Sequence, residues 1–196
     1  MVTMDPAPIH EHALSNLRYI REAMERASAF TSIPGWGGVG VGLTAIATAA
    51  LTHPFAGTRR WLLGWLGCAV VSAVIASIAM FRKARRANVS FNGAPARRFF
   101  SSYFAPIAAG AALTYVLGHF GLYAVLPATW LLLYGASFIS SGAFSIPVVP
   151  VMGVCFMVMG VLACFVPVSA GNLLLGAGFG GLHVAFGVVI ARRYGG

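Results

Sequence analysis

Residues 61–81 read WLLGWLGCAVVSAVIASIAMF, a run without a charged side chain that is bounded by Arg60 and Arg82. Crossing the hydrocarbon core of a bilayer takes about 20 predominantly apolar residues in a helix. Five further apolar runs of comparable length lie around it, at 36–52, 99–117, 122–141, 148–166 and 172–191. The sequence therefore predicts an all-α polytopic membrane bundle of six transmembrane helices, arranged as three hairpins.

The composition supports a membrane protein and argues against several kinds of catalytic and transport function. Hydrophobic residues make up 59% of the chain and charged residues 9%, with a mean hydropathy of +0.84, which is outside the range of soluble domains. Only four residues are acidic, and none follows Glu25. Carboxylate catalysis, metal-dependent hydrolysis and ion coupling all need acidic groups in or near the spans. We therefore predict a protein without enzymatic activity.

Basic residues concentrate on one side of the predicted membrane. Eleven of the thirteen fall in the N-terminal segment, the connection between the second and third spans, and the tail: Arg18, Arg21, Arg26, Arg82, Lys83, Arg85, Arg86, Arg97, Arg98, Arg192 and Arg193. Because basic residues are retained in the cytoplasm, both termini are predicted to be cytoplasmic. The Ala-, Gly- and Arg-rich composition indicates a bacterial inner membrane. We expect the net charge of +9 to attract anionic lipid headgroups, and not nucleic acid, because no soluble domain presents the basic residues.

The segment before the first span, residues 1–34, forms a region separate from the six-span domain at 35–196. Its apolar residues recur every three or four positions: Leu14, Leu17, Ile20 and Met24. This spacing places them on one face of a helix, which we expect to run from position 14 to Phe30. Such an amphipathic helix is typical of the membrane surface. A docking or self-association helix is the alternative, because the apolar seam resembles two heptads.

The first and last spans are dense in glycine. Gly38 and Gly42, like Gly176 and Gly180, stand four residues apart. This is the spacing of small residues that lets two helix backbones approach closely. We expect these faces to be packing surfaces. The leading functional hypothesis is that the protein self-associates, or binds a membrane partner, through them.

The first and third hairpins resemble each other, and they open on similar segments, AFTSIP at 29–34 and AFSIP at 143–147. The third hairpin carries the residues Gly153, Gly160, Leu162, Pro167, Leu173, Leu174, Leu175, Gly176 and Gly187, and the first echoes them with Gly42, Leu43, Pro54, Leu62, Leu63 and Gly64. On these residues the spans resemble the HdeD-like group of small bacterial membrane proteins. The resemblance implies a non-enzymatic envelope protein associated with stress or acid tolerance.

His183 lies deep in the last predicted span. An ionisable group at such a depth is by default a candidate functional residue. Three interpretations stay open: a structural hydrogen bond to a neighbouring helix, a ligand or gating role shared with Asn172, and ligation of haem or a metal. A small channel or facilitator for a neutral or anionic solute, lined by Asn172 and His183, is therefore the second functional hypothesis.

Met152, Cys155 and Met159 follow one another at i, i+3 and i+7 in the fifth predicted span, hence on one helical face. Sulfur ligands at this spacing suit Cu(I). Methionine is also an ordinary filler of helix contacts. We therefore predict no cofactor, and keep a cofactor- or metal-bearing membrane subunit as a third hypothesis.

Overall fold

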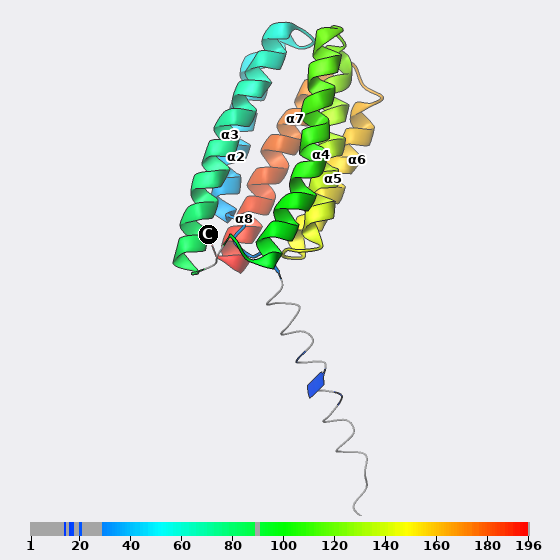
Figure 1. Cartoon of the computed structure of the whole chain (residues 1–196). Coiled ribbons are helices and arrows are strands. Elements are labelled where there is room, and N and C mark those ends of the chain that lie inside the picture. The colour runs from blue at the N-terminus through cyan, green and yellow to red at the C-terminus, as the bar shows by residue number, and fades with distance from the viewer. Residues whose placement is uncertain (1–13, 15, 18–19, 21–28, 89–90, 196) are drawn as a thin grey trace, which may run out of the picture.

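A computed structural model of the chain describes residues 14, 16–17, 20, 29–88 and 91–195 (Figure 1). The long helices are α2 (Gly35–Thr52), α3 (Arg59–Arg86), α4 (Ala94–His119), α5 (Leu126–Gly142) and α6 (Val148–Ala163). The last rod joins α7 (Val168–Leu175), the π-helical segment η3 (Gly176–Leu182) and α8 (His183–Tyr194). Two short 3-10 turns, η1 (His53–Phe55) and η2 (Tyr123–Val125), precede α3 and α5. The predicted all-α class is confirmed for the described residues.

Within the described part of the chain, five helical rods are long and apolar enough to cross a membrane: Gly35–Phe55, Arg59–Arg86, Ala94–His119, Tyr123–Gly142 and Val168–Tyr194. The fifth predicted span, 148–166, corresponds to α6, which holds 16 residues and lies alongside α5. At 1.5 Å per residue α6 is about 24 Å long, against about 30 Å for the hydrocarbon core. Apolar, membrane-type helices are thus confirmed, while the count of six spans stays a prediction.

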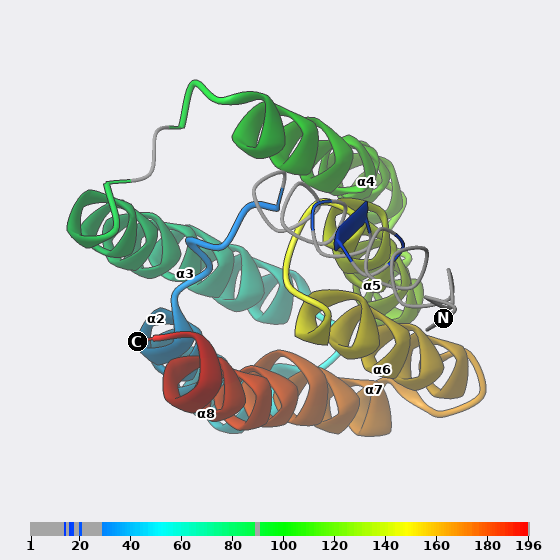
Figure 2. The ribbon, with the colours of Figure 1, turned by 90° about the horizontal axis from the view of Figure 1, so that it is seen from below.

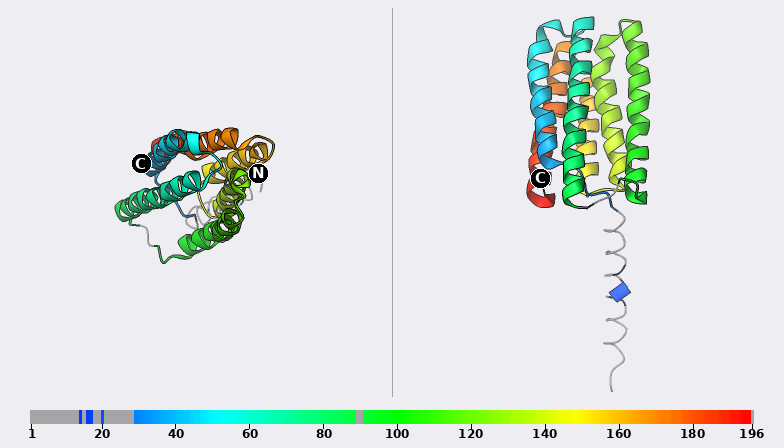
Figure 3. Two further views of the ribbon diagram at one scale, coloured as in Figure 1. Left: turned by 90° about the horizontal axis from the view of Figure 1, so that it is seen from above. Right: turned by 60° about the vertical axis from the view of Figure 1, so that its left-hand side comes forward.

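The rods run up and down between two ends of the bundle (Figures 1 and 3). One end gathers the end of α3, the start of α4 and the end of α8, which carry Arg82, Lys83, Arg85, Arg86, Arg97, Arg98, Arg192 and Arg193. We call this the basic end. Arg59 and Arg60 begin α3 at the opposite end. The basic residues that the sequence predicts to lie on one side of the membrane thus gather at one end of the bundle, as far as the described residues go. The orientation of this end in a membrane stays a prediction.

Two helix contacts bring backbones close together. A Cβ atom at Gly42 of α2 would lie 2.7 Å from the carbonyl oxygen of Gly180 in η3. A Cβ atom at Gly135 of α5 would lie equally close, 2.7 Å, to the carbonyl oxygen of Gly153 in α6. No side chain fits at such distances, so glycine is what permits both contacts. The bundle is built on these pairs, with α3 packed on α2 and α4 packed on α5 (Figure 2).

Residues 29–34 cross the basic end before α2 begins (Figure 2). Phe30 pairs with Ser145 in an isolated parallel bridge, in which the Phe30 amide donates to the Phe144 carbonyl at 2.7 Å and the Ser145 hydroxyl donates to the Phe30 carbonyl at 2.8 Å. The two similar segments of the sequence thus pair with each other. The Phe30 ring is 1% exposed and packs on Phe99 and Phe100 of α4.

The predicted amphipathic helix is only partly within the described residues. Leu14, Leu17 and Ile20 are helical and exposed, and Met24 lies outside the described part of the chain. Phe30 was expected to end this helix, but it belongs to the extended segment instead. Its buried ring and its bridge to Ser145 explain the difference, because these tertiary contacts hold the backbone extended. The amphipathic helix as a whole stays a prediction.

Candidate functional site: two buried polar centres

The first polar centre surrounds Asn172 of α7, which is 0% exposed. Its Oδ1 atom accepts hydrogen bonds from the indole nitrogens of Trp61, at 2.8 Å, and Trp65, at 3.1 Å. The Thr52 hydroxyl lies 3.5 Å from the same oxygen. An indole N–H can only donate, so the two tryptophans fix which way the amide points. We call Asn172, with Trp61, Trp65 and Thr52, the asparagine centre.

The amide nitrogen of Asn172 points to α2. It donates to the Ala49 carbonyl at 2.9 Å, and it lies 3.4 Å from Nδ1 of His53. Since the amide can only donate there, Nδ1 of His53 accepts and the proton of a neutral imidazole is on Nε2. The asparagine side chain therefore joins α2, α3 and α7, and its hydrogen-bonding capacity is used within the chain.

Stacked tryptophans extend this centre to two more helices. The Trp61 ring stacks on Trp130 of α5, with centroids 5.5 Å apart and an interplanar angle of 11°. The Trp130 indole donates to the Thr114 hydroxyl of α4 at 2.8 Å, and that hydroxyl donates to the Gly110 carbonyl at 2.6 Å. Buried indole N–H groups usually need such a partner. One network thus connects α2, α3, α4, α5 and α7 near the end opposite the basic end.

The second polar centre surrounds His183, at the start of α8. Its Nε2 atom is 2.8 Å from the hydroxyl oxygen of Tyr134 in α5. Four aromatic rings lie with their centroids 5.4 to 6.4 Å from the imidazole: Tyr134, Phe138, Phe156 and Phe179. The other ring nitrogen, Nδ1, is buried and makes no hydrogen bond of good geometry, although the carbonyls of Gly178 and Phe179 lie near the ring. We call this the histidine centre.

The π-helical segment η3 leads directly into the histidine centre. Its sequence, GAGFGGL, is unusually rich in glycine, and glycine imposes little restriction on the backbone. Segments of π-helix are rare and are often found at functional sites. A Cβ atom at Gly178 would lie 2.7 Å from Leu131 of α5, so the segment is also closely packed. The widened turn therefore sits between the two polar centres and against the core.

The structure places the two predicted ligand or gating residues in different centres. Asn172 and His183 are separated along the last rod by Leu175, which is buried, and by Phe179. The Phe179 ring packs on Phe156 and Trp65, with centroids 5.3 and 6.2 Å away. An apolar layer thus lies between the centres.

Nearby hydroxyl groups bond to their own helices. The hydroxyls of Ser137 and Ser141 in α5 donate to the carbonyls of Tyr134 and Ser137, both at 2.7 Å. The Thr48 hydroxyl of α2 donates to the Thr44 carbonyl at 2.9 Å. Such local bonds satisfy Ser and Thr without a partner from another helix. These hydroxyls contribute little free polar surface to a path along the bundle.

The four glycines predicted to pack helices all lie where α2 meets the last rod. A Cβ atom at Gly38 would lie 3.4 Å from Cα of Gly187, and one at Gly176 would lie 2.9 Å from Cβ of Ala49. Gly42 and Gly180 face each other directly. These faces are used within one chain, so a second copy cannot use them without opening the bundle.

The three residues predicted for Cu(I) lie on α6. Met152 is buried in the core, Met159 lies against Gly178 of η3, and Cys155 is half-buried. Among the described residues, no group of three or more His, Cys, Asp or Glu side chains is placed to hold a metal ion. Packing accounts for the positions of both methionines, and copper binding stays a hypothesis.

Sequence reasoning missed the partners in both centres. Trp61 and Trp65 are four residues apart at the start of α3, a spacing that signals two indoles on one inward face. Tyr134 lies in the middle of a span, where a buried hydroxyl needs a partner. Pairing it with His183 required the tertiary structure.

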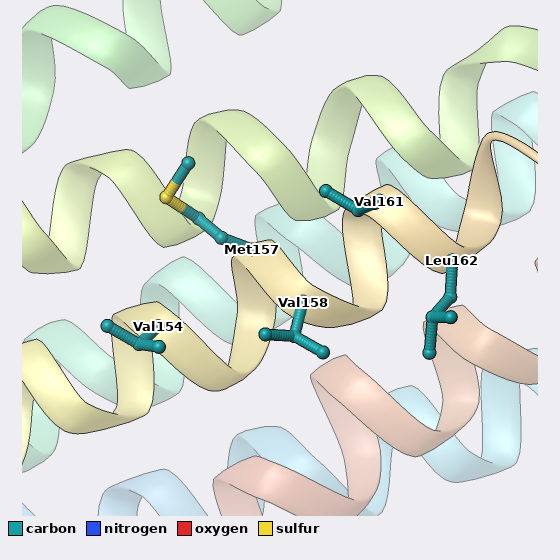
Figure 4. Close-up of a pocket in the computed structure, with 5 residues that line it drawn as sticks. All are labelled: Val154, Met157, Val158, Val161 and Leu162. Atoms are coloured by element: carbon teal, nitrogen blue, oxygen red, sulfur yellow. The ribbon is translucent and has the colours of Figure 1, made fainter.

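A groove of about 290 Å³ runs along the outward face of α6 (Figure 4). It is lined by Val154, Met157, Val158, Val161 and Leu162, all apolar. Comparison with protein-family models, with curated proteins and with solved structures finds no match for this chain.

Proposed function

We propose that this chain is a non-catalytic integral membrane protein that binds another transmembrane helix, with a second copy of itself as the partner. The observation that carries the proposal is a row of four valines on the outward face of α6: Val151, Val154, Val158 and Val161. Each of them is 51 to 55% exposed. The groove of Figure 4 lies along the same row.

The spacing of the valines suits helix association. They follow one another within α6 at intervals of three, four and three residues. Apolar residues at this spacing form the seam by which two helices pack in a left-handed pair. Transmembrane bundles commonly adopt the same left-handed crossing. The shallow groove along the valines is the surface on which we expect the side chains of a second helix to pack.

The length of α6 also favours association. A helix of about 24 Å is shorter than the hydrocarbon core, and oligomerisation is one way in which a membrane protein accommodates a short span. The glycine faces of α2 and the last rod are already occupied within the chain. We therefore place the interface at the row of valines on α6 and not at the glycine faces.

The absence of enzymatic activity is supported by the sequence, because no acidic residue occurs in residues 26–196. A solute channel ranks second, because Asn172 and the hydroxyls of Ser137 and Ser141 are paired within the bundle. We further propose a bacterial inner membrane, with the basic end in the cytoplasm and near anionic lipid headgroups, following the retention of basic residues on that side.

Disulfide cross-linking in lipid nanodiscs and native membranes tests the proposal. In a background with Cys68, Cys155 and Cys164 replaced by alanine, Val158→Cys should give a cross-linked dimer under mild oxidation. The matched control is Val74→Cys on α3, whose side chain is also about half exposed and faces away from the bundle. A dimer at Val158 and not at Val74 is the expected result. Monomers at both positions, or cross-linking at Val74 alone, would contradict the proposed interface.

A further inference from the structure

The basic ends of α3 and α4 stand apart and are joined by the connection that contains Phe91 (Figure 2). The Phe91 ring lies 4.9 Å from Phe81 of α3 and 6.2 Å from Phe100 of α4, between ring centroids. It also lies 6.0 Å from Phe30. A row of aromatic rings therefore spans the space between the two helix ends.

Two arginines lie one turn beyond these rings, toward the basic end. Arg85 follows Phe81 by four residues on α3, and Arg97 precedes Phe100 by three residues on α4. Residues three or four apart share a helix face, so each arginine lies on the face that carries a ring of the row. Both arginines are exposed. The two helices thus present one guanidinium each at the edge of the aromatic row.

No acidic side chain of the described part neutralises these arginines, because the four acidic residues of the chain all precede position 26. Lys83 is engaged differently: its ammonium group donates to the carbonyls of Ile33, Tyr194 and Gly195, which tie the start of α2 to the end of α8. Within the described part of the chain, Arg85 and Arg97 therefore carry charge that a bound anion can neutralise.

We infer that Arg85 and Arg97 bind the phosphate group of an anionic phospholipid. Arginine forms two parallel hydrogen bonds to phosphate, and basic pockets between transmembrane helices at the cytoplasmic side suit anionic headgroups. The acyl chains would lie against the exposed apolar residues that continue from this site along the two helices, such as Ile78 and Phe104. This apolar continuation favours a lipid over free phosphate. The inference rests on the proposed membrane placement of the basic end and is independent of the α6 interface.

The test uses the full chain in neutral detergent, with lipid binding followed by native mass spectrometry. Phosphatidylglycerol should be retained in preference to phosphatidylcholine. Arg85→Gln/Arg97→Gln should weaken the binding of phosphatidylglycerol by about thirtyfold, since each basic residue contributes a factor of about five. The matched control is Arg192→Gln/Arg193→Gln, which removes the same charge from exposed positions at the same end. The control should lower binding by less than about threefold.

Three outcomes would overturn the inference. The first is equal retention of the two lipids by the unmodified protein, and the second is an equal loss in both double variants, which would indicate general charge attraction. The third is displacement of phosphatidylglycerol by millimolar inorganic phosphate, which would assign the site to a free anion. Thermal unfolding of each variant checks that it is folded, and Arg85→Lys/Arg97→Lys, which keeps the charge, should retain part of the preference. Cross-linking at Val158→Cys should be unchanged in these variants, so the two proposals can fail separately.

Discussion

The two polar centres lie on the same rod and are buried to a similar degree, yet they use their side chains differently. Asn172 has all of its polar atoms engaged, by partners on α2 and α3. Among the described residues, His183 has one side-chain partner, the Tyr134 hydroxyl, and its other ring nitrogen is buried without a hydrogen bond of good geometry. Burial of a polar residue in a membrane bundle therefore does not by itself indicate function. The asparagine and histidine centres differ in how much of the hydrogen-bonding capacity of their central side chain is used.

The largest effect is expected from disrupting the close contact between α2 and the last rod, the rod that carries both centres. Gly180→Leu should destabilise the bundle by about 3 kcal/mol or prevent folding, because the new side chain would meet the backbone of α2 at Gly42. Gly181→Leu is the matched control, since a Cβ atom there meets nothing within 4 Å. Thermal unfolding in detergent measures both. Equal melting temperatures for the two variants would contradict the close contact between α2 and the last rod.

The next largest effect concerns the asparagine centre. Asn172→Leu should lower the free energy of unfolding by about 2 kcal/mol, because it leaves the indoles of Trp61 and Trp65 and the Ala49 carbonyl without a partner. Leu173→Ala, at an exposed neighbouring position, is the control. Tryptophan fluorescence should also change in the Asn172 variant. If its stability equals that of the control, the hydrogen bonds of this centre contribute nothing measurable.

The sequence predicted the elements of the fold better than their contacts. Long apolar runs locate membrane-type helices, and the spacing of Gly38, Gly42, Gly176 and Gly180 falls where helices meet in the structure. Hydropathy could not show which apolar face is buried, because lipid is as apolar as a protein core. The sequence pattern of the exposed valines on α6 is therefore the same as that of a buried helix face. The short length of α6 was also not visible in its composition, since the apolar run continues past its end at Ala163.

The contacts that build the two centres join residues far apart in the chain. Trp61 and Asn172 are 111 positions apart, and Tyr134 and His183 are 49 apart. The spacing of residue types along one helix does not show which distant residue each side chain contacts. The extended segment at Phe30 depends on tertiary contacts in the same way. The candidate residues His183 and Asn172 could be chosen by type and depth, but their partners could not.

A smaller effect is expected at the histidine centre. Tyr134→Phe keeps the ring and removes the hydroxyl that bonds to His183, so it should cost about 0.6 kcal/mol, the average for hydrogen bonds within membranes. Tyr115→Phe, at an exposed position of α4, is the control. His183→Gln should cost no more than about 1 kcal/mol if the imidazole is only structural. An oligomeric state that changes between about pH 5 and 8, and no longer does so in His183→Gln, would instead assign the histidine centre a sensing role.

The smallest effect should come from His53, at the edge of the asparagine centre. His53→Ala removes an acceptor 3.4 Å from the Asn172 amide, a long contact, while the stronger bond of that amide to the Ala49 carbonyl remains. His53 is exposed, so water can take the place of its ring nitrogen. We expect a change below about 0.5 kcal/mol in the same unfolding measurement. A loss as large as that of Asn172→Leu would mean that water cannot reach the amide.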